Sequence, residues 1–282
     1  MTPDQHVLQV AAWRADRDAR LRNPNGWLAL VGLSWLIPGE NHVGAHPSSQ
    51  VVLHGHDVPP RVGSVWLEEG RVRFIPHEGV DLPEEVLEDD SGGDPTVLEI
   101  GSLRFHLIKR GERIGVRVRD AGAPALASFA GLDHFPIDPS WRIEARLEPA
   151  PPDAEIEIVD ITGATSRDAT PGSVAFERGG ATWRIAALPG EGSDRCVWLV
   201  FGDATNGAET YGGGRFLYTE PVAADGTVAV DFNLAYNPPC VFSPWATCPL
   251  PPAQNRLGLR IEAGEKDWHA PEEHDHTAQG VA

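Results

Sequence analysis

The sequence predicts an all-β protein with one helix at its N-terminus. Residues 4–22 contain no proline or glycine, and four apolar residues, Leu8, Ala11, Ala12 and Ala15, fall on one helical face. Beyond them the chain breaks into short apolar or alternating runs separated by glycine, proline and aspartate, which is typical of strands joined by turns. The sequence contains no second long helical pattern, so a leading helix followed by sheets is expected.

The order of the elements follows from these signals. The helix should end at residues 23–26, Asn-Pro-Asn-Gly, because this run stops helices. Hairpins are predicted where Gly70 and Asp225-Gly226 lie between alternating runs. The predicted strands are residues 50–53, 64–68, 71–75, 103–108 and 113–119, then 141–147, 154–159, 173–177, 182–187, 196–201, 215–219, 227–232 and 258–262.

The strands fall into two groups around residues 121–139, a segment of weak strand character with several prolines and glycines. We therefore predict a helix at residues 1–23, a β-sandwich-like unit at 24–120 and a β-barrel-like unit at 121–282. The two β units should pack as one body. The last unit should end in a flexible tail that carries the histidine-rich run at residues 269–276.

Charge and hydropathy exclude several classes of partner. The formal net charge of −18 argues against duplex nucleic acid and anionic membranes, since both attract basic surfaces. No apolar run reaches the roughly 18 residues of a membrane-spanning helix. The N-terminus lacks the basic start and apolar centre of a signal peptide, so a cytoplasmic location is expected.

The strongest candidate site lies where two predicted strands of the second unit meet. A hairpin closed at residues 225–226 would bring Arg215, which begins one strand, opposite Asp231, near the end of the next. Asp231 and Asn233 alternate onto the same face of their strand. Two interpretations remain open: an ion pair that closes the end of a barrel, or a pocket in which Arg215 holds a carboxylate or similar anion.

The functional interpretation assigns roles to the residues around this cluster. Gly212 to Gly214 would let the backbone approach a ligand closely, although no lysine or helix follows them as in a phosphate loop. Carboxylates and a phenol would serve acid–base chemistry, and the remaining polar groups would bind the ligand. The candidate catalytic residues are Glu209, Tyr211 and Asp231, and the candidate ligand-binding residues are Arg215, Asn233, Tyr236, Asn237 and Arg256.

A proline-rich loop, residues 237–256, is expected to cover this site as a lid. Its six prolines fix φ and remove backbone donors, so it cannot be a central strand. The loop also holds Cys240 and Cys248. Their spacing is wider than that of zinc ligands, and neither a metal nor a cofactor is predicted. A disulfide, two small buried apolar residues and a nucleophile paired with a distant histidine remain open.

Four motifs carry a resemblance to a known family. They are residues 23–28 with 31–36, residues 135–138, residues 209–217, and the segment 231–256 that includes the lid. Together they resemble an uncharacterised prokaryotic family catalogued as domain of unknown function 1684. The resemblance spans nearly the whole chain after the first helix and implies no activity.

A second resemblance concerns the first unit. The rhythm of residues 38–53 is similar to the phosphopeptide-reading edge of a forkhead-associated domain, which implies a β-sandwich. That family has an arginine where this chain has Ala45, and residues 61–64 do not match its later Ser-x-x-His element. These departures argue against phosphothreonine binding.

We therefore predict a soluble small-molecule-binding protein or enzyme, with a polar pocket at the end of the second β unit and an anionic ligand. The alternative is a non-catalytic interaction module that uses the first unit as its recognition surface. Neither a Gly-x-Ser-x-Gly elbow nor a His-Glu-x-x-His helix is present in the sequence. A cavity ending on Arg215 and Asp231 would favour the first reading, and a filled barrel the second.

Overall fold

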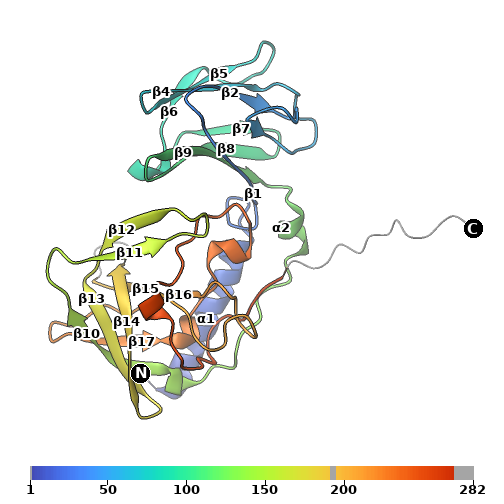
Figure 1. Cartoon of the computed structure of the whole chain (residues 1–282). Helices are drawn as coiled ribbons and strands as arrows, with labels where there is room; N and C mark the ends of the chain where they lie inside the picture. Colours follow the sequence, from blue (N-terminus) through green and yellow to red (C-terminus); the bar gives the residue numbers. More distant parts are fainter. Residues whose placement is uncertain (1, 191–194, 270–282) are drawn as a thin grey trace, which may run out of the picture.

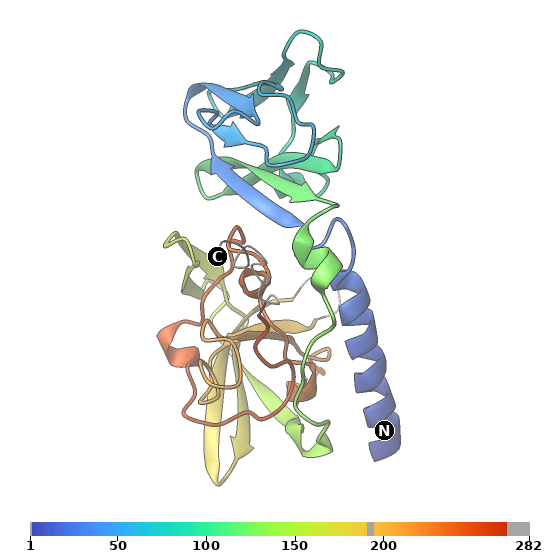
Figure 2. The same cartoon turned by 90° about the vertical axis from the view of Figure 1, so that its right-hand side faces the viewer.

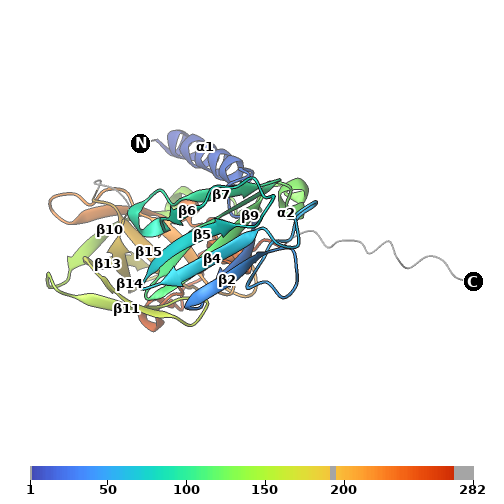
Figure 3. The same cartoon turned by 90° about the horizontal axis from the view of Figure 1, so that it is seen from above.

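The structure, a computed structural model, describes residues 2–190 and 195–269. The chain is mostly β with an N-terminal helix, as predicted (Figure 1). Seen from above, the first β unit lies over the second, and the helix runs along one side (Figure 3). Most of the histidine-rich tail, from residue 270 onward, lies outside the described residues.

The helix α1 (Pro3–Leu21) forms where its sequence pattern predicts. Thr2 and Gln5 form a capping box at its start, which satisfies two backbone donors that a helix would otherwise leave free. The helix buries His6, Val10 and Leu21. No helix in the described part of the chain is long and apolar enough to cross a membrane.

The first β unit consists of two sheets that enclose one core. Phe74 of one sheet meets Phe105 of the other at 6.1 Å between ring centroids. The Gly70 hairpin is confirmed, since Glu69 and Gly70 both have positive φ, as the tight turns that suit twisted strands require. One sheet has the order β1 (Leu30–Trp35), β9 (Arg113–Asp120), β8 (Leu103–Arg110), β7 (Val97–Ile100). The other has the order β3 (Val51–Val52), β2 (Gly39–Gly44), β4 (Gly63–Glu68), β5 (Arg71–Pro76), β6 (Glu85–Leu87).

The second β unit is a six-stranded sheet that curls into a half-barrel, with a separate hairpin of β11 (Glu155–Val159) and β12 (Thr165–Ala169). Phe176, Phe201 and Phe232 fill its interior, with ring centroids 5.3 and 5.6 Å apart. The strand order is β16 (Arg215–Tyr218), β15 (Val197–Phe201), β14 (Ala181–Pro189), β13 (Gly172–Arg178), β10 (Arg142–Pro149), β17 (Thr227–Asp231).

Two sequence predictions about this unit are wrong. The turn at residues 225–226 forms, but residues 220–223 pair across it, and β16 and β17 lie at opposite edges of the sheet. The chain after β17 closes the curl instead, since Tyr236 bridges to Phe216. Residues 258–262 form no strand, although Ile261 is fully buried in the core.

Two connections join the units, residues 22–29 and residues 121–138 with the short helix α2 (Pro124–Ser128). They lie side by side, because Leu30 pairs with Arg119 and the Asp120 N–H donates to the Ala29 carbonyl. Helix α1 precedes the first unit in the chain but packs along the second, as Figure 2 shows. The first unit is therefore inserted between α1 and the sheet that α1 covers.

Candidate functional site

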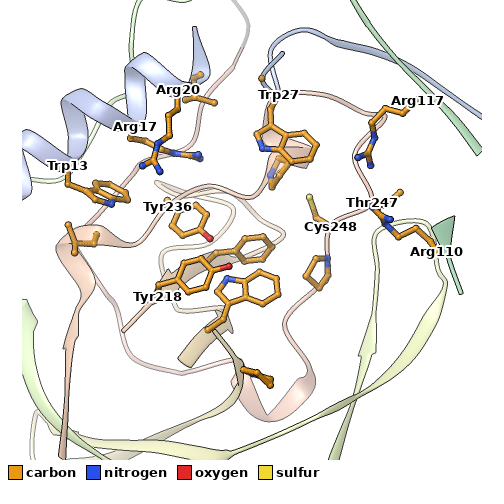
Figure 4. Close-up of a pocket in the computed structure, with 18 residues that line it drawn as sticks. Trp13, Arg17, Arg20, Trp27, Arg110, Arg117, Tyr218, Tyr236, Thr247 and Cys248 are labelled. Carbon is orange, nitrogen blue, oxygen red and sulfur yellow. Dashed lines mark hydrogen bonds between the residues drawn. The ribbon is translucent and has the colours of Figure 1, made fainter. Parts of the chain in front are cut away.

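A cleft of about 820 Å³ opens where α1, the first unit and the half-barrel meet (Figure 4). Arginines line it from α1 and from β8 and β9, and aromatic rings line it from the second unit. Cys248 and Thr247 of the proline-rich loop lie between these two surfaces. The site thus draws its residues from both units.

One face of β8 and β9 carries five arginines and one histidine, and we call it the arginine face; Arg110 and Arg117 of this face line the cleft. The antiparallel register places basic residues directly opposite one another, and in two of the three pairs both side chains are arginines, an arrangement that destabilises a sheet. The opposed pairs are Arg104 with Arg119, His106 with Arg117, and Arg110 with Arg113. Stability alone does not account for this clustering in a chain of net charge −18.

Arg117 is the unusual member of this face. It is only 4% exposed, and its Nε has no hydrogen-bond partner. Among the residues that the structure describes, none forms an ion pair or a hydrogen bond with its guanidinium. The guanidinium carbon lies 5.5 Å from the centroid of the Trp27 ring. Burial, with Arg110 and Arg119 nearby, lowers the pKa of Arg117 to about 10, so it stays charged at neutral pH.

The neighbours of Arg117 leave positive charge unbalanced. Arg110 is neutralised by Asp90 through two hydrogen bonds of 3.0 and 2.9 Å. Arg119 has no carboxylate partner among the described residues, and its guanidinium lies 5.9 Å from the Trp27 ring centroid. His106 is neutral at neutral pH, because burial and then Arg119 and Arg117 lower its pKa to about 4. Arg117 and Arg119 therefore form no direct ion pair, although Asp90 also attracts both, and Arg119 Nη1 lies 3.4 Å from the His106 ring nitrogens.

The opposite side of the cleft is an aromatic wall formed by Trp198, Phe216, Tyr218 and Tyr236. The Trp198 and Tyr218 rings are nearly parallel, at 17° and 6.0 Å, and Tyr218 and Tyr236 are too, at 13° and 6.4 Å. Phe216 meets Trp198 edge-on at 4.9 Å. Figure 4 shows Tyr218 and Tyr236 of this wall across the cleft from Trp27 and Arg117. Such a surface suits the flat apolar part of a ligand.

The helix side of the cleft is held by a buried carboxylate. Arg17 bonds Glu265 at 3.0 Å and the Asn237 carbonyl at 3.0 Å, and it lies over the Tyr236 ring at 5.0 Å. Burial raises the pKa of Glu265, which is fully enclosed. Arg20 pairs with Asp16 on the surface of the helix. Arg17 thus positions α1 and already has its counterion.

The two loop cysteines lie together under the cleft, and both are free. The Cys240 N–H donates to Cys248 Sγ at 3.2 Å, and the Tyr211 hydroxyl lies beside the Cys240 thiol. Contact with Cys248, and then with Tyr211, lowers the pKa of Cys240 despite burial. The same thiol contact and burial raise the pKa of Cys248. In the described part of the chain, no three His, Cys, Asp or Glu side chains gather as metal ligands.

The glycines before β16 pack against the protein's own side chains. A Cβ on Gly213 would come within 2.4 Å of the Tyr211 ring, and one on Gly214 within 2.4 Å of Pro251. Gly214 also has a φ of +92°, which favours glycine. The close approach that the sequence predicted therefore positions Tyr211 beside Cys240.

The expected pairing of Arg215 with Asp231 is wrong. Arg215 is fully buried, pairs with Asp203 at 2.6 Å and donates to the backbone carbonyls of Ile261 and Ala263. Asp231 instead pairs with His6 of α1 at 2.5 Å. The two residues belong to separate networks because the strands that carry them do not pair, and neither lines the cleft.

The other predicted residues are scattered. Glu209 pairs with the exposed Arg260, and Asn237 is fully buried and bonds the Lys266 carbonyl at 2.7 Å. Arg256 is exposed on the far side of the lid, beside Gly202. Asn233 is also fully buried and bonds Asp231 and the Asp138 backbone, whereas Tyr236 lines the cleft. The sequence reasoning missed Arg117, Arg119 and Trp27, although arginines recur at alternate positions in β9, the strand that carries the first two.

Comparisons with known proteins place the second unit in a family. The solution NMR structure of an uncharacterised protein from Haloarcula marismortui is 32% identical, covering 50% of this chain and 78% of that chain, with a TM-score of 0.42. No protein with a curated description matches the sequence. The family match is narrower than the motifs predicted, because residues 23–36 and the arginine face lie outside it. Over residues 127–266 the chain belongs to the family described as protein of unknown function DUF1684.

Proposed function

We propose that the protein binds a small organic anion in the cleft between its two β units. The buried guanidinium of Arg117 carries this proposal. An ionised group enclosed without a counterion costs on the order of several kcal/mol. A ligand carboxylate, sulfonate or phosphate would supply the missing negative charge and accept hydrogen bonds from the free N–H groups of Arg117.

The electrostatics of the cleft support an anion over other ligands. Four arginines line it, Arg17, Arg20, Arg110 and Arg117, and the described lining includes no aspartate or glutamate. Three of these arginines already pair with a carboxylate, so Arg117 supplies the charge that would attract an anion in this chain of net charge −18. The volume of about 820 Å³ falls within the usual range for small-molecule sites.

Binding is the activity proposed, and not a reaction. The described residues that line the cleft include no carboxylate or histidine to serve as a general base. Glu209, Tyr211 and Asp231 do not line it, so the proposal gives them no catalytic function.

The test compares an anion with its neutral analogue. Calorimetric titration should show that 1-naphthoate binds at least about tenfold more tightly than 1-naphthamide, a difference of roughly 1.4 kcal/mol. Arg117→Met should abolish the preference. Arg71→Met removes an exposed charge from the same unit and should keep it. Equal binding of acid and amide, or unchanged binding by Arg117→Met, would contradict the proposal.

A further inference from the structure

We infer that the bound anion is an aromatic phosphate monoester, with its phosphate at Arg117 and its ring against the aromatic wall. This inference rests on the proposed function and narrows it to a ligand class that includes mononucleotides. Three features of the cleft lead to it: the amount of unbalanced charge, the way the guanidiniums are held, and the surface that faces them.

The unbalanced charge suits a dianion. Asp90 pairs directly with Arg110 and attracts Arg117 and Arg119 without pairing with them, so three guanidiniums face one carboxylate and a surplus of two positive charges remains. A carboxylate or sulfonate would balance only one of these charges. A phosphate monoester carries a charge of about −1.5 to −2 at neutral pH and presents three strong acceptor oxygens. Bound at Arg117, which lines the cleft, it would balance this surplus, to which Arg119 contributes its charge from behind the lining.

The guanidiniums are held by an aromatic ring and not by acids. Arg117 and Arg119 lie two residues apart on β9 and both approach Trp27, at 5.5 and 5.9 Å from the ring centroid. A ring fixes the planar group through its face and leaves the N–H edges free. A carboxylate would fix it through those edges and occupy them. Both Nε atoms are buried and have no partner, as this arrangement predicts.

The aromatic wall adds a requirement that a bare phosphate does not meet. Trp198, Tyr218 and Tyr236 line the same cleft as a row of rings stacked on one another, and a ligand ring would pack on the part of this row that the cleft exposes. Stacking a ligand ring on such side chains typically increases affinity by about tenfold or more. The phosphate and the ring would be bound by different units, since the arginine face belongs to the first unit and the aromatic wall to the second.

The experiment separates this inference from the proposed function by using three probes. They are 1-naphthyl phosphate, 1-naphthoate and methyl phosphate, titrated by calorimetry at about pH 7.5, where phosphate monoesters are dianions. We expect naphthyl phosphate to bind at least about tenfold more tightly than either of the others. Naphthoate binding as tightly as naphthyl phosphate would overturn the phosphate assignment and leave anion binding intact. Methyl phosphate matching naphthyl phosphate would overturn the aromatic assignment, and no binding of any probe would remove the proposed function itself.

Two variants assign the contacts. Arg119→Met should reduce the affinity for naphthyl phosphate by about tenfold and affect naphthoate less, because a monoanion needs only Arg117. Arg119→Lys keeps the charge and should restore most of the loss, which a merely structural effect would not show. An equal loss for both probes in Arg119→Met, without rescue by lysine, would overturn the dianion assignment. Circular dichroism of each variant confirms that it is folded.

Discussion

Replacing Arg117 with methionine should stabilise the protein while removing its anion preference. The pKa of Arg117 is about 10, well below the ordinary value for arginine. At about 1.4 kcal/mol per pKa unit, burial makes the charged form unfavourable by roughly 3 kcal/mol. The open side of the cleft screens part of this, and loss of the contact with Trp27 costs about 0.5–1 kcal/mol. A net gain of about 1 kcal/mol is expected, which raises Tm by about 2–4 °C.

The assay is urea unfolding of the ligand-free protein, compared with a second buried arginine. Arg215→Met removes the partner of Asp203, which is buried, and leaves backbone carbonyls without a donor. It should lower the free energy of unfolding by about 3–5 kcal/mol. Opposite signs for the two variants would separate a binding residue from a structural one. If Arg117→Met destabilises the protein as much as Arg215→Met does, the reasoning that assigns Arg117 to a ligand is refuted.

Three further predictions concern residues that are not proposed to contact the ligand. Because the pKa of His106 is about 4 when folded and 6.5 ordinarily, the unfolded chain binds more protons between these values. The free energy of unfolding should therefore fall by roughly 2 kcal/mol as the pH drops through this window, and His106→Gln should remove that part of the loss in urea titrations. His6→Ala leaves a buried carboxylate unpaired and should cost about 2–4 kcal/mol, and a loss below about 1 kcal/mol would show that the pair is unimportant. Tyr211→Phe should raise the pKa of the Cys240 thiol and slow its alkylation by iodoacetamide at neutral pH, measured by mass spectrometry, whereas an unchanged rate would contradict the contact.

The fold was predictable where the decisive signals are local. Alternation of side chains identified most strands, and Gly70 identified a hairpin, because these patterns depend only on neighbouring residues. The pairing of β16 was not predictable, since the curl of the sheet separates it from β17 by four other strands. The turn at residues 225–226 forms as predicted. The pairing of β16 with β17, which was inferred from that turn, does not form.

The site was less predictable because its parts are distant in the sequence. Arg215 and Asp231 are close in the chain, but their actual partners, Asp203 and His6, are set by the folded sheet and by α1. The alternating arginines near Arg117 were visible, but their opposition across two strands depends on register. Nothing in the sequence indicates which side of that sheet faces the second unit.

The first unit, from β1 to β9, is inserted between α1 and the half-barrel. We call this inserted unit the guest, and the rest of the described chain the host. The host is α1 with residues 121–190 and 195–269, and it depends on the helix, since His6 and Arg17 contact carboxylates buried within it. The chain enters the guest through β1 and leaves it through β9, and these strands are adjacent, with Leu30 paired to Arg119. A segment cut to the family match at residue 127 would therefore lack part of the host's own core.

The same division separates the two kinds of ligand recognition. The guest supplies the charge contacts at Arg117, and the host supplies the ring surface at Tyr218 and Tyr236. Each unit has a main core of its own, and the two meet where Leu30 of β1 packs with residues of the half-barrel such as Val200 and Phe216. Preference for charge and preference for shape can therefore change independently in this architecture. A ligand that spans the cleft would add to the contacts that already join guest and host outside the two connecting chains, such as the hydrogen bond from Arg110 to Thr247.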